Sequence, residues 1–208
     1  MPTDIDFMLN TLDDNFCASC FDALDELLTK NKKPIRSDMQ RLMDLGIKSA
    51  MFVTWMIVDD NGNEQLRGCV GSLGKVSIES LGYYAQLSAY DDKRFKPITA
   101  EEVPKLICKV SLLHTYEPAE NPSDWEVGKH GVIIKFYHNG EKYSSTYLPE
   151  VAEENHLTKQ AAINQLIRKA GYRRGDPTKL WKILEVTRYQ SKKLKLSYSD
   201  YVKLDPSI

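Results

Sequence analysis

A pair of β-hairpin signals constrains the fold of this chain more than any other feature. Asn139-Gly140 lies between two runs of β-forming residues, 132–137 and 142–147, and Asn-Gly is a preferred dipeptide of two-residue hairpin turns. The segment Asp-Asp-Asn-Gly-Asn at 59–63 separates Met51–Val58 from Gln65–Val70 in the same way. Each pair of runs therefore predicts two antiparallel strands.

Helices are predicted between and around these hairpins. Apolar residues recur every three or four positions over 16–28, which predicts a helix that faces the core, with Asp13 or Asp14 as its cap. Ser77 can cap a second helix, so Gly68–Gly74 is predicted to be a loop from strand to helix. A third helix runs from a Thr158 cap to Gly171. Further strands are expected at 107–115, 183–189 and 193–197.

This mixture of hairpins and helices predicts an α+β fold with antiparallel sheets and flanking helices. Residues 1–208 are expected to form a single domain, and 42% hydrophobic with 27% charged residues is typical of a globular protein. No apolar run approaches the roughly 18 residues that cross a bilayer, and the start, Met1–Asp6, is acidic rather than basic. We therefore expect an intracellular protein, cytoplasmic or nuclear, without a membrane partner.

The cysteines indicate reduced thiols. Four in a chain of this length are too few and too scattered for a disulfide scaffold. Cys17 and Cys20 have the spacing of half a metal site, but no second pair accompanies them, and both lie on the apolar stripe of the first helix. We interpret them as core residues. Since no dinucleotide, phosphate-loop or metal motif is present either, we expect no metal and no cofactor.

The segment Leu66–Ser72, Leu-Arg-Gly-Cys-Val-Gly-Ser, is the most specialised part of the chain. It places a thiol between two glycines and close to a fixed positive charge. Glycine permits close backbone approaches, and a neighbouring guanidinium favours thiolate over thiol. The segment therefore indicates a site without specifying a reaction, and its candidate residues are Arg67, Gly68, Cys69, Gly71 and Ser72.

Charge is distributed unevenly along the sequence. Residues 1–156 hold 16 Lys/Arg and 25 Asp/Glu, whereas residues 157–208 hold 12 Lys/Arg and 4 Asp/Glu. Such a basic portion can bind nucleic acid, or it can dock on the acidic body of the same molecule. Lys192, Lys193 and Lys195 alternate with Leu194 and Leu196, which predicts an amphipathic strand with its charges outward. No nucleic-acid motif accompanies them.

Five segments carry a family resemblance: Leu66–Ser72, Arg94-Phe95 with Pro97, Val110–Leu113, Asp124–Gly131 and Tyr147–Val151. In this order they resemble the AMMECR domain family, named for a human chromosomal region associated with Alport syndrome, midface hypoplasia and elliptocytosis. The match covers nearly the whole chain, and Phe16–Asp22 resembles the eukaryotic branch. Val70 and Ser72 stand where isoleucine and threonine are usual, and both changes are conservative.

The resemblance implies an α+β domain of two unequal subdomains with a groove between them, whose internal boundary the sequence does not define. It implies no specific activity, although the glycine-flanked cysteine is taken as the functional centre of the family. Prokaryotic relatives occur alongside radical-SAM and Memo-like proteins, which suggests a pathway of modification or redox chemistry.

One hypothesis is a cysteine-dependent enzyme. Cys69 would be the nucleophile, and Arg67 would favour its thiolate or bind a substrate anion, with amides of the same segment as donors to an oxyanion. His130, in a glycine-flanked loop of its own, is the candidate base. A histidine on a hairpin loop is more often solvated than catalytic.

The hypothesis that we favour is a regulatory module that binds a small molecule, a peptide or a protein. In this case Cys69 packs within the site, Arg67 and Arg94 contact the ligand, and Phe95 or Trp125 offers a flat apolar surface.

A purely structural role stays open beside both hypotheses. Arg67 would then pair with a carboxylate, while Gly68 and Gly71 relieve crowding where a strand meets a helix.

Overall fold

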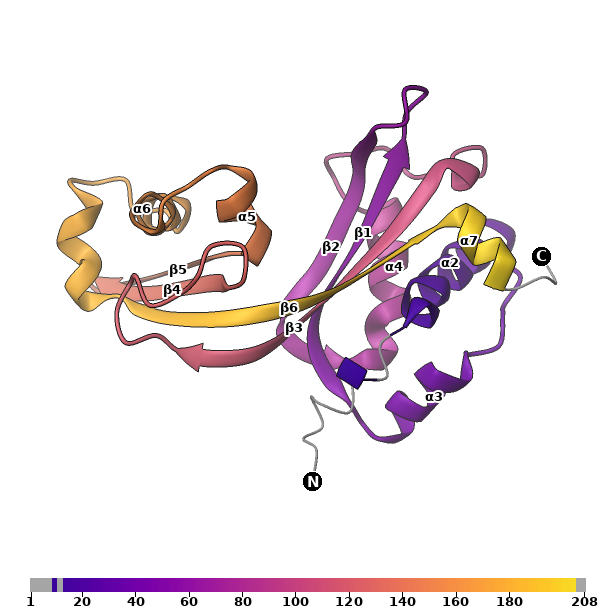
Figure 1. Cartoon of the computed structure of the whole chain (residues 1–208), viewed down its shortest axis with the longest axis horizontal. Coiled ribbons are helices and arrows are strands. Elements are labelled where there is room, and N and C mark those ends of the chain that lie inside the picture. Colours follow the sequence, from indigo (N-terminus) through magenta and orange to yellow (C-terminus); the bar gives the residue numbers. More distant parts are fainter. Residues whose placement is uncertain (1–8, 11–12, 205–208) are drawn as a thin grey trace. The chain divides into compact units, whose positions relative to one another are not determined.

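The computed structural model describes residues 9–10 and 13–204, and it has an α+β fold. The segment Met1–Asp6 lies outside the described residues. One six-stranded sheet has the strand order β2-β1-β3-β6-β4-β5 (Figure 1). The pairs β1/β2, β1/β3, β4/β5 and β4/β6 are all antiparallel. The predicted fold class is therefore confirmed.

The elements follow one another without strict alternation of strand and helix. Short 3-10 turns at Ile78–Ser80, Val103–Lys105 and Pro177–Ile183 stand between them. In chain order the helices and strands are α2 (Asp14–Thr29), α3 (Ser37–Asp44), β1 (Lys48–Val58), β2 (Glu64–Ser77), α4 (Leu81–Tyr90), β3 (Leu106–Pro118), β4 (Gly131–His138), β5 (Glu141–Tyr147), α5 (Pro149–Glu154), α6 (Lys159–Lys169), β6 (Glu185–Ser197) and α7 (Tyr198–Leu204).

The chain divides into two compact units. Unit 1 comprises Met1–Leu113 and Lys192–Ile208, and unit 2 comprises His114–Ser191. The boundaries fall inside β3 and β6, so these two strands each contribute residues to both units. Each unit has its own hydrophobic core.

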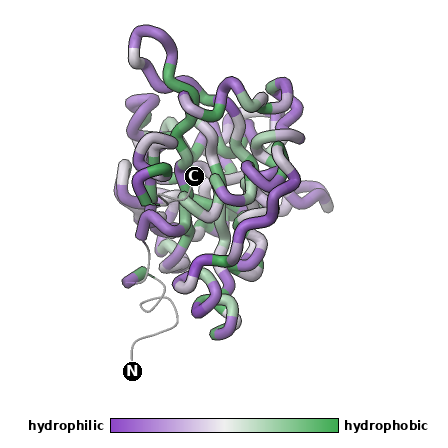
Figure 2. The backbone as a smooth tube through the Cα atoms, turned by 90° about the vertical axis from the view of Figure 1, so that its right-hand side faces the viewer, coloured by the Kyte–Doolittle hydropathy of each residue, from purple (hydrophilic) through white to green (hydrophobic). Residues whose placement is uncertain are grey.

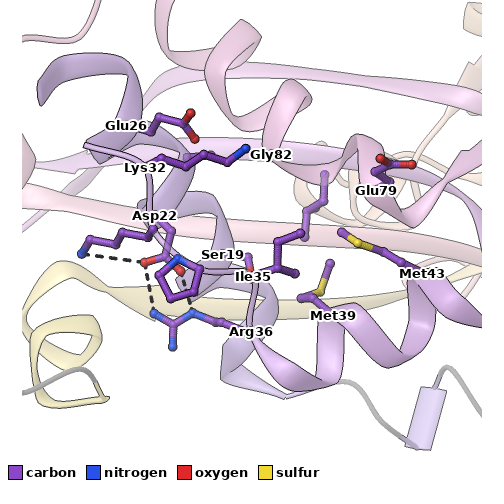
Figure 3. A pocket seen from close by; sticks show the side chains of 14 residues that line it. Ser19, Asp22, Glu26, Lys32, Ile35, Arg36, Met39, Met43, Glu79 and Gly82 are labelled. Carbon is purple, nitrogen blue, oxygen red and sulfur yellow. Dashed lines mark hydrogen bonds and ion pairs between the residues drawn. The ribbon is translucent and has the colours of Figure 1, made fainter. Parts of the chain in front are cut away.

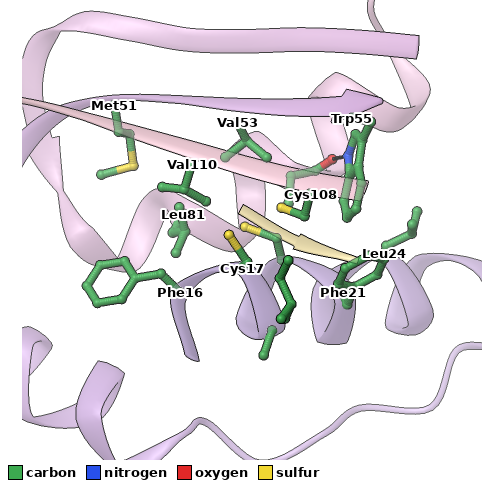
Figure 4. Packing of buried hydrophobic residues seen from close by; sticks show 14 of the residues in the cluster. Phe16, Cys17, Phe21, Leu24, Met51, Val53, Trp55, Leu81, Cys108 and Val110 are labelled. Atoms are coloured by element: carbon green, nitrogen blue, oxygen red, sulfur yellow. Dashed lines mark hydrogen bonds between the residues drawn. The ribbon is translucent and has the colours of Figure 1, made fainter. Parts of the chain in front are cut away.

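The core of unit 1 lies between its helices and its strands. Helix α2 begins where predicted, because the Asp13 carboxylate accepts a hydrogen bond from the Asn15 amide. The apolar stripe of α2 faces β1 and β3, and the thiols of Cys17, Cys20 and Cys108 are fully buried there, as expected for core residues (Figure 4). The indole of Trp55 donates to the Ala85 carbonyl over 2.9 Å, which links β1 to α4.

Unit 2 is built on the predicted Asn139-Gly140 hairpin. Both residues have positive φ, 50° and 81°, as a hairpin turn with two left-handed residues requires. Helix α6 packs on β4 and β5 and begins at Thr158, whose hydroxyl accepts from the Ala161 amide. Figure 2 shows how hydropathy is distributed along the backbone, with hydrophilic stretches in the outer loops.

Two sequence expectations about the strands are wrong. Gly68–Gly74 is not a loop, because β2 continues to Ser77 and pairs Gly71 with Phe52 and Ser72 with Met51 of β1. The expected strands at 183–189 and 193–197 are one continuous strand, β6. Pairing with long neighbouring strands thus extends both elements beyond what local propensity indicates. Ser77 caps the 3-10 turn before α4 rather than α4 itself.

Candidate functional site around Cys69

Cys69 lies on β2, the strand at one edge of the sheet. It stands opposite Thr54 of β1, and the Thr54 hydroxyl donates to the Cys69 sulfur over 3.2 Å. Among the cysteines, Cys69 alone is partly exposed, since Cys17, Cys20 and Cys108 are buried. The specialised segment of the sequence therefore presents the one partly accessible thiol of the described chain.

The backbone of Cys69 is held by the segment that follows α4. Its N–H donates to the Asp92 carboxylate over 2.9 Å, and its carbonyl accepts from the Arg94 guanidinium over 3.3 Å. Asp92 and Arg94 also bind each other through two hydrogen bonds of 3.0 and 2.7 Å. An edge strand otherwise offers such groups to any strand that approaches. Asp92 and Arg94, which we call the clamp, therefore satisfy the backbone hydrogen-bonding groups of Cys69 at this edge.

The electrostatics of the clamp follow from this geometry. The hydrogen bond from Arg94 holds the pKa of Asp92 well below its usual range, and the backbone donors of Cys69 and Arg94 lower that pKa further, against the opposing effect of burial. The side chain of Asp92 is only 7% exposed, whereas that of Arg94 is 58% exposed. Arg94 also lies over the Phe95 ring, 5.4 Å from its centroid.

The two glycines around Cys69 are required by the protein's own backbone. A Cβ atom on Gly68 would lie 2.0 Å from the carbonyl oxygen of Ser88, near the end of α4. A Cβ atom on Gly71 would lie 2.2 Å from the Met51 carbonyl oxygen and 2.6 Å from the Phe52 Cα atom. Neither position tolerates a side chain without backbone movement. The glycines thus let α4 and β1 close on β2.

Arg67 is fully engaged within unit 1. Its guanidinium binds the Glu102 carboxylate through two hydrogen bonds of 2.7 and 2.9 Å, and it donates to the carbonyls of Lys96 and Pro97. The pair holds the pKa of Glu102 below its usual range. Arg67 therefore ties the segment 96–102 to β2. This agrees with the structural role considered for Arg67, in which it pairs with a carboxylate.

The Ser72 hydroxyl bonds locally to the backbone of Gly74. It donates to the Gly74 carbonyl over 3.0 Å and accepts from the Gly74 amide over 3.1 Å. It stabilises the irregular stretch of β2 where the register with β1 shifts.

His130 and Trp125 belong to unit 2, so the structure does not group them with Cys69 within one unit. The His130 ring is 5% exposed, and its Nδ1 atom accepts from the Glu126 amide over 2.9 Å. Burial lowers its pKa. Trp125 is 3% exposed in the core of unit 2 and donates to the Pro122 carbonyl. All four histidines fall in unit 2.

The contrast in charge between residues 1–156 and 157–208 does not correspond to a contrast between the two units. Unit 1 holds 17 Lys/Arg and 19 Asp/Glu, and unit 2 holds 11 and 10, because the basic stretch is shared between them. Leu194 and Leu196 do face the core of unit 1, as the alternating pattern predicts, and Lys195 pairs with Glu64. In unit 2, Arg188 pairs with Glu117 and Asp124.

Over residues 9–10 and 13–204, no three or more His, Cys, Asp or Glu side chains gather in a way that could hold a metal ion. None of the helices in the same ranges is both long and apolar enough to span a membrane.

Sequence reasoning missed Thr54, Asp92 and Glu102. Thr54 could have been found by counting the hairpin register back from the 59–63 turn, had the irregularity near Trp55 been foreseen. Asp92 and Glu102 carry no local signal, because each acts on a strand far away in the sequence.

Fold and site together define an α+β protein in which a partly exposed cysteine is clamped at the edge of an antiparallel sheet. The sequence model of the AMMECR1 family matches residues 17–194. The chain therefore belongs to the AMMECR1 family.

Relatives occur in plants, fungi and archaea. An uncharacterised protein of Arabidopsis thaliana is 45% identical over 155 residues, covering 73% of this chain and 72% of its own length. An uncharacterised protein of Schizosaccharomyces pombe is 42% identical over 141 residues, covering 67% of this chain and 72% of its own length. The crystal structure of the uncharacterised protein PH0010 from Pyrococcus horikoshii matches with a TM-score of 0.69 at 24% identity, covering 89% of this chain and 93% of its own. That likeness concerns the fold alone.

Proposed function

We propose that the chain is a regulatory binding module whose β2 segment around Cys69 contacts a small molecule, a peptide or a protein. The observation that carries the proposal is that Cys69 is held firmly but not covered. Asp92 and Arg94 fix its backbone, while the residue stays partly exposed. A segment ordered in advance loses little conformational entropy on binding, which favours affinity.

The other candidate residues have distinct parts in this proposal. Arg94 and Phe95 supply a charged and an aromatic contact beside the thiol. Arg67, Gly68, Gly71 and Ser72 shape the strand that carries it. The role of His130 as a catalytic base and the contact of Trp125 with a ligand stay predictions, and both residues are buried in unit 2. Nucleic-acid binding also stays a prediction. Neither unit has a large net charge that would support it.

A crosslinking experiment tests the module. Benzophenone maleimide is attached to Cys69 of the folded chain, and crosslinked proteins and peptides are identified in a cell extract. The matched control is Ser144→Cys in a Cys69→Ser background, because Ser144 is exposed on β5 of unit 2. The proposal expects a saturable product from Cys69 that the control lacks. Identical products from both positions would contradict it.

The second candidate function is a cysteine-dependent enzyme, and one observation favours it. The Thr54 hydroxyl donates to the Cys69 sulfur, and a donor hydrogen bond favours the thiolate over the thiol. The reaction rate of Cys69 with iodoacetamide near neutral pH separates the two functions. The module expects a rate no higher than that of an unperturbed thiol, whereas a nucleophile reacts faster.

We further infer an intracellular location, cytoplasmic or nuclear. No disulfide joins any of the four cysteines, all of which lie in the described residues, and reducing compartments keep thiols in this state.

A further inference from the structure

We propose that unit 1 carries a second binding site, distinct from Cys69, for a free aliphatic amino acid in its zwitterionic form. The site is a pocket of about 180 Å³ between α2, α3, the segment 32–36 and the start of α4 (Figure 3). Its dimensions suit a small molecule rather than a macromolecular surface, because 180 Å³ is the volume of about six water molecules.

The floor of the pocket is apolar. Met39 and Leu81 are buried, Met43 is half-buried, and Ile35 is 54% exposed. Figure 3 shows the side chains of Ile35, Met39 and Met43 gathered on one side of the space. Methionine adapts its shape to different apolar groups, so this floor suits a branched aliphatic side chain.

Some of the charged side chains around the pocket are already satisfied. The Asp22 carboxylate accepts from Arg36 over 2.7 and 3.2 Å and from the Tyr201 hydroxyl over 2.7 Å. Lys33 donates to the Tyr201 hydroxyl and lies 3.6 Å from the Asp25 carboxylate. This cluster is internally compensated and holds the segment 32–36 against α2 and α7.

Three other ionisable side chains line the same pocket and are not part of this cluster. Glu26, Lys32 and Glu79 form no side-chain hydrogen bond or ion pair with another residue in the described ranges. Figure 3 shows the ends of Glu26 and Lys32 on the same side of the pocket, with Glu79 across from them. One wall thus presents a carboxylate and an ammonium group together.

This arrangement selects for a ligand with both charges. The ammonium group of an amino acid would pair with Glu26 and its carboxylate with Lys32, while the side chain lies on Ile35, Met39 and Met43. An amine alone leaves Lys32 without a counter-charge, and an acid alone leaves Glu26 without one. Because Lys32 is exposed and Glu26 is half-buried, each ion pair strengthens binding by about twofold to fivefold.

Methionine-methyl NMR of the full chain tests the proposal with three matched compounds. Leucine carries both charges, leucinamide only the ammonium group, and 4-methylpentanoate only the carboxylate. We expect leucine to shift the methyl signals of Met39 and Met43 saturably, with about threefold higher affinity than either analogue. Tighter binding of leucinamide would instead assign the site to a peptide amino terminus and overturn the proposal.

Two variants locate the binding to this wall. Glu26→Gln and Lys32→Met should each weaken leucine binding about threefold, and Lys32→Met should abolish the preference over leucinamide. Glu154→Gln, an exposed carboxylate of α5 in unit 2, is the matched control and should bind leucine like the wild type. Unmoved methyl signals with all three compounds, or equal affinities for them, would also overturn the proposal.

Discussion

Replacing Gly68 by alanine should strongly destabilise unit 1. The new methyl group would lie 2.0 Å from the Ser88 carbonyl oxygen and 3.1 Å from the Ser88 carbonyl carbon. Both atoms belong to the backbone of α4, so no side-chain rotation relieves the contact. The last turn of α4 must therefore move away from β2 by about 1.4 Å before the contact reaches 3.4 Å, the lower limit of ordinary van der Waals contact.

The cost can be worked from what this movement disturbs. Overpacking of a close contact costs about 1–3 kcal/mol. Movement of α4 also strains the hydrogen bond from Trp55 to the Ala85 carbonyl, and a buried hydrogen bond contributes about 1 kcal/mol. We expect Gly68→Ala to lower the free energy of unfolding by about 3 kcal/mol, a large fraction of the stability of an ordinary domain.

Urea unfolding followed by tryptophan fluorescence measures this change, since Trp55 is buried beside α4. Gly74→Ala is the matched control, because its Cβ atom would meet only the Ser72 hydroxyl at 3.5 Å, and its effect should stay within about 0.5 kcal/mol. If Gly68→Ala unfolds at the same urea concentration as the wild type, the packing explanation of this glycine is refuted.

Three further changes test other contacts. Asp92→Asn should cost about 2 kcal/mol near neutral pH, because Cys69 and Arg94 lose a charged acceptor. Since the native pKa of Asp92 is depressed, its stabilisation is complete above the unfolded value of about 3.9 and is lost progressively as pH falls from there through the lower native pKa. The gap between the urea midpoints of the two proteins should therefore narrow steadily below about pH 3.9, and a pH-independent gap would contradict this. Thr54→Val should slow alkylation of Cys69 about threefold through loss of the donor to its sulfur, and an unchanged rate in a timed iodoacetamide assay would count against that role. Tyr201→Phe should lower the free energy of unfolding by about 1 kcal/mol in chemical denaturation, because its hydroxyl joins Lys33 to Asp22. Tyr198→Phe, beside it, is the reference, and an equal decrease in both variants would argue against a stabilising role of this cluster.

The sequence predicts the parts of the fold that depend on local chemistry. The Asn139-Gly140 turn, the cap of α2 at Asp13 and the cap of α6 at Thr158 all follow from neighbouring residues. The full length of β2 does not, because residues after Val70 stay in the strand through pairing with β1. Helices α3 and α7 are short and were not predicted from periodicity.

The candidate site was only partly predictable for the same reason. Cys69 stands out in the sequence because of its two glycines, yet those glycines are explained by α4 and β1, which approach from distant parts of the chain. Arg67 was expected to contact a ligand or to pair with a carboxylate, and its tight binding to Glu102 agrees with the second. The clamp of Asp92 and Arg94 required the three-dimensional structure.

The central claim is that Cys69 is a partly accessible thiol on a strand whose backbone is already held in place. Brief alkylation of the native protein, followed by peptide mapping with mass spectrometry, tests this claim most directly. The account predicts modification of Cys69 alone, because the other three cysteines are buried. Protection of Cys69 until the protein unfolds, or equal modification of Cys17, Cys20 and Cys108, would contradict it.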